Sequence, residues 1–288
     1  MKQTFKVLVA IFALTVAAQT FADKLVWSVS GLKMPESVEY DKVNDRYYVS
    51  NLNGGVKLKD GNGSIGLIDG SGKLLDVDWV KGLHSPKGLA LHNNKLYVAD
   101  VKQLVVINVN SGKIIARYMA EESEVLNGIA VNKNGTVFVS DWLENRIYKL
   151  EEGELKLWLE TAKLNSPNGL WVDTKHLYVA SWGAGLNDDF STATSGNIKK
   201  ISLKTKTITT LPQGKHWFNM DGIFPYSTGK WLVSDYIKGE VFVLNAYGKV
   251  EKSLKLKKGA ADFYYIDNKK LLIVPLMEDN QVVAYTLD

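Results

Sequence analysis

The feature that most constrains this chain is a phrase that occurs six times along it. Each copy has a small turn, an apolar strand, a short polar hairpin and a second apolar strand that ends in a small or acidic residue. The copies begin at Pro35, Pro86, Leu126, Pro167, Met220 and Ala261. Aligned on their second residues, they lie 51, 40, 41, 53 and 41 residues apart. A period of about 40 residues with short strands is typical of β-propeller blades.

Each unit has room for four strands, and the last unit is one strand short. The sixth copy ends with the strand-like segment 281–287, whereas segment 24–29 stands alone at the other end of the chain. Pairing 24–29 into the last blade would close the ring and leave no long unpaired edge. We therefore predict an all-β fold, a six-bladed β-propeller with four antiparallel strands per blade, as one domain over residues 23–288. The alternative of two packed sandwiches would leave the strand at each end unexplained.

Residues 1–22 have the order of a secretory signal peptide: lysines, an apolar run, then small residues. The run is shorter than the roughly 18–20 residues of a membrane span, so we expect cleavage after Ala22 and an exported protein, periplasmic or secreted. No later segment is apolar enough to span a membrane. Cleavage removes Lys2 and Lys6, which lowers the net charge from +4 to +2 and argues against nucleic acid as a partner. The absence of Cys excludes disulfides, zinc–thiolate sites and cysteine nucleophiles.

In a propeller, the starts of the innermost strands surround the axis on one face. The residues at this place form a ring rich in oxygen donors: Glu36, Lys87, Asn127, Asn168, Asp221 and Asp262. The metal ligands that we predict are Glu36, Asn127, Asn168 and Asp221. Two carboxylates and two amide carbonyls suit Ca²⁺, with Mg²⁺ and Mn²⁺ as alternatives and Zn²⁺ less favoured without nitrogen or sulfur ligands. The competing interpretation is that Asn-Gly and Asp-Gly are turn chemistry before each strand.

Lys87 brings an ammonium group into the same ring. It would either anchor a substrate carboxylate or pair with Glu36 and weaken the metal site, and small geometric changes decide between such arrangements. Asp262 has a structural interpretation of its own, as a partner of Lys87.

A second polar ring is expected where the second strand of each unit ends, at Asn51, Asp100, Asp141, Ser181 and Asp235. From this ring we predict Asp100 and Asp141 as substrate-binding residues, together with Lys87. The two longer spacings come from loops 52–63 and 182–196, which would face each other across the ring and suggest a lid or a substrate-selecting wall. Trp182 in the second loop and His216, on the connection to Asp221, complete the predicted substrate site.

Three of the phrases carry a resemblance to a known family. They are Pro35-Glu36-Ser37, Ser166-Pro167-Asn168-Gly169 and Met220-Asp221-Gly222, in this order along the chain. They resemble the senescence marker protein/gluconolactonase/LRE-like family over essentially the whole mature chain. The resemblance implies a six-bladed propeller with a divalent metal on its axis, held by the residues Glu36, Asn168 and Asp221. Related calcium-dependent propellers of the paraoxonase and diisopropylfluorophosphatase type imply Asn127 as well.

The resemblance also implies a metal-dependent hydrolase of lactone or ester bonds that acts on a small molecule. The metal would polarise the substrate's oxygen, and Asp221, or in second place Asp262, would act as general base or nucleophile. The alternative is a non-catalytic propeller that binds a small ligand or a protein partner around a structural metal. The surplus of carboxylates favours the enzyme. Lys87 favours the binding protein, as does the lack of a counterpart for an arginine that family lactonases use.

Overall fold

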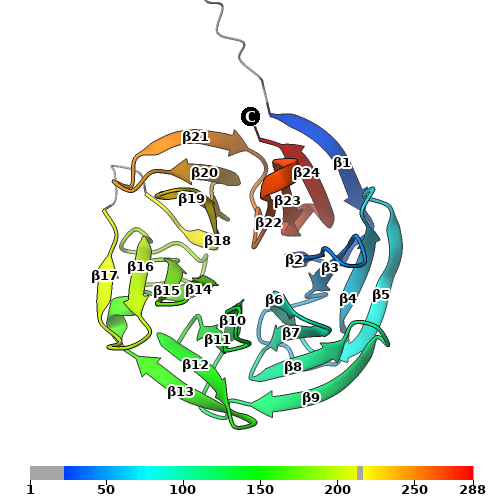
Figure 1. Cartoon of the computed structure of the whole chain (residues 1–288), viewed down its shortest axis with the longest axis horizontal. Coiled ribbons are helices and arrows are strands. Elements are labelled where there is room, and N and C mark those ends of the chain that lie inside the picture. Colours follow the sequence, from blue (N-terminus) through cyan, green and yellow to red (C-terminus); the bar gives the residue numbers. More distant parts are fainter. Residues whose placement is uncertain (1–22, 213–216, 288) are drawn as a thin grey trace, which may run out of the picture.

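The computed structural model describes residues 23–212 and 217–287. Their strands form six four-stranded antiparallel sheets, arranged as blades around a central axis (Figure 1). The predicted fold is therefore confirmed. The predicted signal peptide, residues 1–22, and the candidate His216 lie outside the described residues. In the described part of the chain, no helix has the length and hydropathy of a membrane span.

Each blade runs outward from an inner strand at the axis. Blade 1 contains β2 (Pro35–Asp41), β3 (Arg46–Asn51), β4 (Gly63–Asp69) and β5 (Leu74–Leu83). Blade 2 contains β6 (Pro86–His92), β7 (Lys95–Asp100), β8 (Gln103–Asn108) and β9 (Lys113–Met119). Blade 3 contains β10 (Leu126–Val131), β11 (Val137–Asp141), β12 (Arg146–Glu151) and β13 (Glu154–Glu160).

The short 3₁₀ helix η1 (Ala162–Leu164) leads into the second half of the ring. Blade 4 contains β14 (Pro167–Val172), β15 (His176–Ser181), β16 (Ile198–Ser202) and β17 (Ile208–Thr210). Blade 5 contains β18 (Met220–Ser227), β19 (Lys230–Asp235), β20 (Glu240–Leu244) and β21 (Val250–Lys255). Blade 6 contains β22 (Tyr264–Ile266), β23 (Leu271–Leu276), β24 (Gln281–Thr286) and β1 (Lys24–Ser30), with η2 (Asp267–Lys269) and η3 (Met277–Asp279) in its turns.

The two ends of the chain close the ring. β1 pairs antiparallel with β24, with Ser30 opposite Gln281, so the outermost strand of the last blade comes from the N-terminal side (blue beside red in Figure 1). Trp27 of β1 also reaches blade 1, where its ring lies 5.5 Å from that of Tyr47. The predicted closure is confirmed, and blade 6 has its full set of strands.

The core consists of apolar layers between neighbouring blades, because side chains of a strand alternate between its two faces. Six buried clusters each join two adjacent blades. Tyr48 of blade 1 and Val98 of blade 2, for example, belong to one of them. Outer strands such as β9 alternate instead between exposed and half-buried residues. Packing on both sides of every blade holds the inner strands rigidly around the axis.

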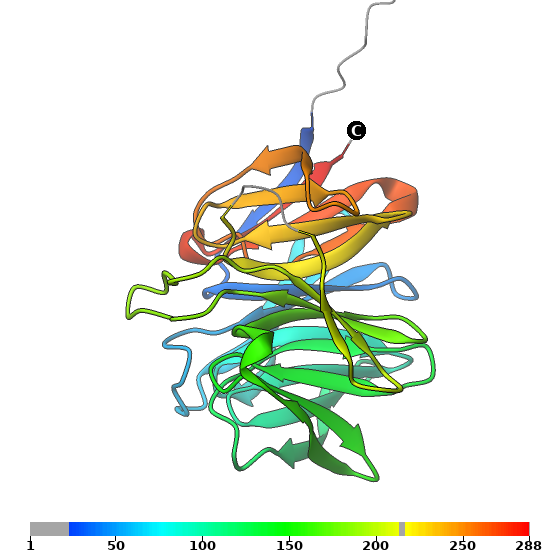
Figure 2. The same cartoon turned by 90° about the vertical axis from the view of Figure 1, so that its left-hand side faces the viewer.

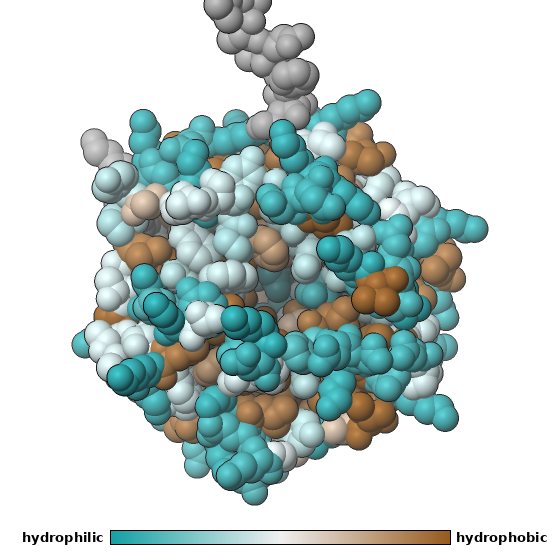
Figure 3. All heavy atoms as spheres, viewed as in Figure 1, coloured by the Kyte–Doolittle hydropathy of each residue, from teal (hydrophilic) through white to brown (hydrophobic). Residues whose placement is uncertain are grey.

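The two faces of the ring differ. Loops 52–63 and 182–196 project from the same face, on the left in Figure 2. The hairpin turns that join the first and second strands of each blade lie on the opposite face, which Figure 1 shows. That face is hollowed at its centre (Figure 3). The axis therefore has an opening on each face, and the two openings have different linings.

Candidate functional site

The ring of candidate ligands is placed by an irregularity that recurs in five inner strands. In each, the antiparallel register shifts by one residue near the start of the strand. In blade 1, Pro35 lies opposite Asn51, but the next regular pair is Val38 with Val49, so the inner strand has one residue more. Each bulge contains two residues, of which the first is Glu36, Lys87, Asn127, Asn168 or Asp221. A bulge redirects a side chain out of the regular pleat, which explains why these residues line the axis.

The backbone N–H groups freed by a bulge need acceptors. In three blades, a serine of the second strand accepts this hydrogen bond. The pairs are Ser37 N–H to Ser50 Oγ at 2.9 Å, Gly128 N–H to Ser140 Oγ at 2.8 Å and Gly222 N–H to Ser234 Oγ at 2.7 Å. Each bulge in these blades is thus stabilised from within its own sheet.

The glycine after three of the site residues lets neighbouring blades meet at the axis. A Cβ atom at Gly88, Gly128 or Gly169 would lie 2.4, 2.3 or 2.2 Å from the backbone carbonyl oxygen of the next blade's site residue. No side chain fits at such distances. These pairs lie within inner strands, so the turn interpretation of Asn-Gly and Asp-Gly was wrong. The glycines bring the ligand-bearing backbones together.

The four predicted metal ligands form the floor of a cavity of about 350 Å³ on the face with the long loops. All four side chains are buried. Three of their oxygens have no hydrogen-bond partner, namely Glu36 Oε2, Asn168 Oδ1 and Asp221 Oδ1. Buried polar atoms without a partner cost free energy and are rare. This floor is therefore suited to an occupant that supplies positive charge.

The pKa shifts of the two carboxylates at the floor also favour a bound cation. Burial raises the pKa of Glu36 well above its usual range, the charges of Asp221 and Asp262 raise it further, and Lys87 lowers it. Burial also raises the pKa of Asp221, and the charges of Asp262 and Asp235 add to the shift. A cation held between the two carboxylates would offset both their burial and their mutual repulsion.

The donor set determines which cation would fit. In residues 23–212 and 217–287, no group of three or more His, Cys, Asp or Glu side chains is arranged to hold a metal. A cation here would therefore need the amide oxygens of Asn127 and Asn168 beside the two carboxylates. Such an all-oxygen set suits Ca²⁺ better than Zn²⁺.

Lys87 lines the cavity, but its ammonium group bonds to the protein. Nζ donates to the Val56 carbonyl at 2.8 Å, the Ser85 carbonyl at 2.8 Å and Ser85 Oγ at 3.3 Å. These bonds use all three of its protons. In this geometry Nζ forms no ion pair with Glu36 and has no proton free for a substrate, although its charge still lowers the pKa of Glu36. Lys87 instead fastens loop 52–63 through Val56, and burial lowers its pKa to about 8.

The second ring faces away from the cavity. The Asp100 carboxylate accepts the backbone N–H groups of residues 84 and 85 at 2.9 and 2.7 Å, and Asp141 accepts those of residues 124 and 125 at 2.9 and 3.1 Å. Each carboxylate thereby fastens the loop that leads into the inner strand of its own blade. Neither lines the cavity, so their predicted placement at a substrate site is corrected. The loop N–H groups need these acceptors.

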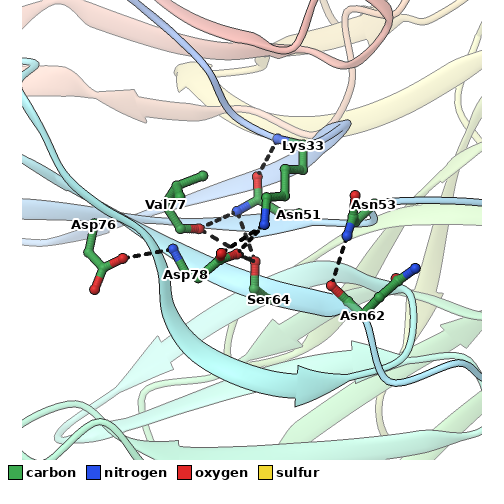
Figure 4. Close-up of polar contacts among 8 residues, drawn as sticks. All are labelled: Lys33, Asn51, Asn53, Asn62, Ser64, Asp76, Val77 and Asp78. Carbon is green, nitrogen blue, oxygen red and sulfur yellow. Dashed lines mark hydrogen bonds and ion pairs between the residues drawn. The ribbon is translucent and has the colours of Figure 1, made fainter.

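Asn51 has the same role in blade 1 (Figure 4). Its Oδ1 accepts the Lys33 N–H at 3.0 Å, and its Nδ2 donates to the Val77 carbonyl at 2.9 Å. The Lys33 ammonium group in turn bonds Asp78 at 2.7 Å. This network ties the segment before β2 to the outer strand β5, away from the axis.

Asp262 lies toward the opposite opening of the ring. Its N–H donates to the Glu36 carbonyl at 2.9 Å, and one carboxylate oxygen accepts the Ser37 hydroxyl at 3.2 Å. The side chain lines the second cavity, of about 250 Å³, and burial raises its pKa to about 7. Asp262 therefore does not share a cavity with Asp221, and it is not the partner of Lys87.

The two long loops form walls of the first cavity, as the sequence predicted. Val56 stands on one side, and Trp182 and Phe190 on the other. Trp142 extends the aromatic wall, because its ring lies 5.4 Å from that of Trp182 and 5.6 Å from that of Phe190. Tyr236 continues it at 5.7 Å from Trp182.

Sequence reasoning did not single out several of the apolar residues that line the cavity. Phe190 belongs to the wall, and Met34 and Met277 complete the rim. Phe190 is the second aromatic residue of loop 182–196, after Trp182, and this was the signal that could have revealed it. The methionines carry no such signal, because their segments meet the cavity only after the ring has closed.

The fold and the site together define the class: a six-bladed β-propeller with an oxygen-lined axial cavity. Among solved structures, the selenomethionine-substituted virginiamycin B lyase from Staphylococcus aureus is similar, with a TM-score of 0.65 and 11% sequence identity. The match covers 93% of this chain and 100% of that one. No family model matches the sequence, and no curated protein matches it either. The structural likeness shows the fold, and the family resemblance stays a prediction.

Proposed function

We propose that this protein is an exported, divalent-metal-dependent hydrolase of lactone or ester bonds, with Ca²⁺ as the best-suited metal. The observation that carries the proposal is the set of unpaired buried oxygens on Glu36, Asn168 and Asp221 at the floor of one cavity. Asn127 lines the same floor. Export rests on the predicted signal peptide.

The residues of the cavity would have separate roles in binding and in proton transfer. A bound divalent cation supplies a Lewis acid that favours negative charge on a substrate oxygen. Asp221 would take a proton from the attacking water at Oδ1, which is at the cavity floor and has no hydrogen-bond partner. The aromatic wall would hold the organic part of the substrate above this floor. Asp262 lines the cavity of the opposite opening and not this one, so we assign the proton transfer to Asp221 alone.

A non-catalytic binding protein with a structural metal is the second candidate. It is favoured because the described residues that line the cavity include no His, Ser, Thr or Arg. Asp221 would then have to be both ligand and base. The similar structure is named a lyase, so a test of activity should also distinguish elimination from hydrolysis.

The metal site is tested by thermal melting after chelation, with Ca²⁺, Mg²⁺, Mn²⁺ and Zn²⁺ added back separately. A cation that binds only the folded state, at 100 times its Kd, stabilises by about 2.7 kcal/mol. We expect a rise in Tm with Ca²⁺ that Glu36→Gln abolishes. Glu154→Gln, on the exposed outer strand β13, is the matched control and should keep the rise. No rise with any ion would contradict the proposed site.

The catalytic proposal is tested with Asp221→Asn, which keeps an oxygen ligand and removes the base. Loss of a general base lowers turnover by about a hundredfold or more. Mass spectrometry of the products separates the reactions, because hydrolysis adds one water and elimination adds none. Unchanged turnover in the variant would refute the mechanism. A metal-dependent Tm shift without turnover of any ester or lactone would favour the binding protein.

A further inference from the structure

The first cavity has no cationic group left to bind an acidic ligand. Lys87 is its only lysine or arginine among the described lining residues, and its three protons are bonded to Val56 and Ser85. The floor carries two carboxylates, so a bound divalent cation would be neutralised by the protein itself. An anionic ligand would lose its water without gaining a cationic side chain as a partner.

The walls also have few hydrogen-bonding groups for a ligand with many hydroxyl groups. Above the floor, they consist of apolar and aromatic residues: Met34, Leu52, Val56, Trp142, Trp182, Phe190, Tyr236 and Met277. Two of the polar groups there are already engaged. Trp182 Nε1 donates to the Phe190 carbonyl at 2.8 Å, and the Tyr236 hydroxyl lies 3.4 Å from Glu278 Oε1. Among the described wall side chains, Trp142 Nε1 alone is a buried polar atom without a partner, so most hydroxyl groups of a polyol would be buried against these walls without partners, which is unfavourable.

The aromatic wall is held in a fixed arrangement. Phe190 stacks on Trp142 at an interplanar angle of 29°, while Trp182 meets Trp142 edge to face at 68°. The Phe190 backbone has a φ of 66°, which is unusual for a bulky residue. The loop maintains it through the Phe190 N–H to Asn187 carbonyl bond at 3.0 Å and the Trp182 Nε1 bond to the Phe190 carbonyl. Rings held in this way are preorganised to receive a flat apolar group.

We infer that the axial cavity selects uncharged ligands that carry a flat aromatic group, and that Phe190 determines this specificity. As a statement about substrates, the inference rests on the proposed function. The substrate would be an uncharged ester or lactone with an aryl substituent, whose carbonyl lies toward Glu36 and Asp221. Sugar-acid lactones would be poor substrates.

The experiment measures binding without requiring activity. N-phenyl-1-naphthylamine and 1-anilinonaphthalene-8-sulfonate share one aromatic skeleton, and only the second carries a negative charge. We expect the uncharged probe to bind the full mature chain at least about tenfold more tightly, by fluorescence titration.

Phe190→Asn removes the ring but tolerates a positive φ, and it should weaken binding about tenfold. Phe190→Tyr keeps the ring and should restore the affinity. Tyr247→Ala, at an exposed turn of blade 5, is the control and should change nothing.

Activity assays on phenyl acetate and glucono-δ-lactone separate the two proposals. Binding that depends on Phe190, without hydrolysis of either compound, supports the inference and contradicts the proposed function. Hydrolysis of the sugar lactone in preference to the phenyl ester overturns the inference and leaves the proposed function intact. Equal or tighter binding of the sulfonated probe also overturns the inference.

Discussion

Lys87 shows that the position of a residue in the repeat does not determine which groups its side chain binds. It occupies the same place in its bulge as Asn127 and Asn168, so the repeat alone predicts that it faces the axis in the same way. Its longer side chain, however, reaches the Val56 carbonyl of the adjacent loop. A buried ammonium group needs hydrogen-bond acceptors, and these were available in the protein. A residue's position in the repeat therefore predicts where its backbone lies and not which partner its side chain takes.

The substitution Lys87→Met removes the charge and keeps an apolar chain of similar length. We expect Ca²⁺ to bind about tenfold more tightly, because a positive charge that faces Glu36 is lost. Loop 52–63 should become more sensitive to trypsin, because it loses its bond to the ammonium group. Titration calorimetry and limited proteolysis measure the two effects.

The control for Lys87 is Lys102→Met, which removes a lysine that pairs with Glu124 outside the cavity. It should leave Ca²⁺ binding unchanged. If Lys87→Met weakens Ca²⁺ binding while the loop stays resistant to trypsin, the electrostatic account is refuted.

The element that places the site residues around the axis is the bulged start of the inner strand. Its site residue, its glycine and the serine of the second strand act together in blades 3 and 5. Blade 1 differs, because Ser37 replaces the glycine and bridges to Asp262 of blade 6. The contact between the first and last blades therefore combines a backbone hydrogen bond, from the Asp262 N–H to the Glu36 carbonyl, with the side-chain hydrogen bond from Ser37 to Asp262. The repeated phrase in the sequence predicts this element. The reason for its glycine is the close approach of the next blade's backbone, which only the tertiary structure shows.

Gly169→Ala tests the close approach between blades 4 and 5. The new Cβ would lie 2.2 Å from the Asp221 carbonyl oxygen, so the inner strands must separate. Overpacking of this kind costs about 1–3 kcal/mol or more, or roughly 3–10 °C in Tm. The rise in Tm with Ca²⁺ should also shrink, because Asn168 and Asp221 move apart.

The matched control is Gly153→Ala, in an exposed turn where a Cβ meets no atom within 4 Å. It should cost only about 1–2 kcal/mol for its positive φ and keep the Ca²⁺ effect. A Gly169→Ala variant that keeps the same Ca²⁺ response as this control would show that the close approach does not place the ligands.

For the whole molecule, the ring depends on the pairing of β1 with β24. This pairing completes blade 6 and also brings Trp27 onto blade 1. Both cavities lie on the axis, so their shape depends on a closed ring. The segment just after β1 strengthens the junction, because the Met34 N–H donates to Asn280 Oδ1 at 2.7 Å. Closure thus joins the chain ends and also positions Met34 at the cavity rim.

A disulfide between facing residues of β1 and β24 tests this closure. Ser30→Cys with Gln281→Cys would be the only thiols in the chain. A cross-link that encloses a segment of this length stabilises by about 5–6 kcal/mol in the loop-entropy model. We expect a clear rise in Tm under oxidising conditions that a reductant reverses.

The comparison pair is His176→Cys with Ser202→Cys, which face each other within blade 4. This pair encloses a much shorter segment, for which the same model predicts a stabilisation smaller by about 1–2 kcal/mol. If both disulfides raise Tm equally, opening at the β1–β24 seam does not limit the stability of the ring.

The sequence by itself determined the architecture: the number of blades, the strands in each, the closure and the four oxygen-bearing residues proposed as ligands. These follow from local periodicity and turn chemistry, which repeat within about 40 residues. Only the tertiary structure decided how the polar groups are used. Asp100 and Asp141 accept backbone N–H groups, and Asp262 lies at the other opening. Phe190 reaches the cavity through its loop. These outcomes depend on bulges that redirect side chains and on contacts between blades. Such contacts join residues that are far apart in the chain, so the periodicity of the sequence does not predict them.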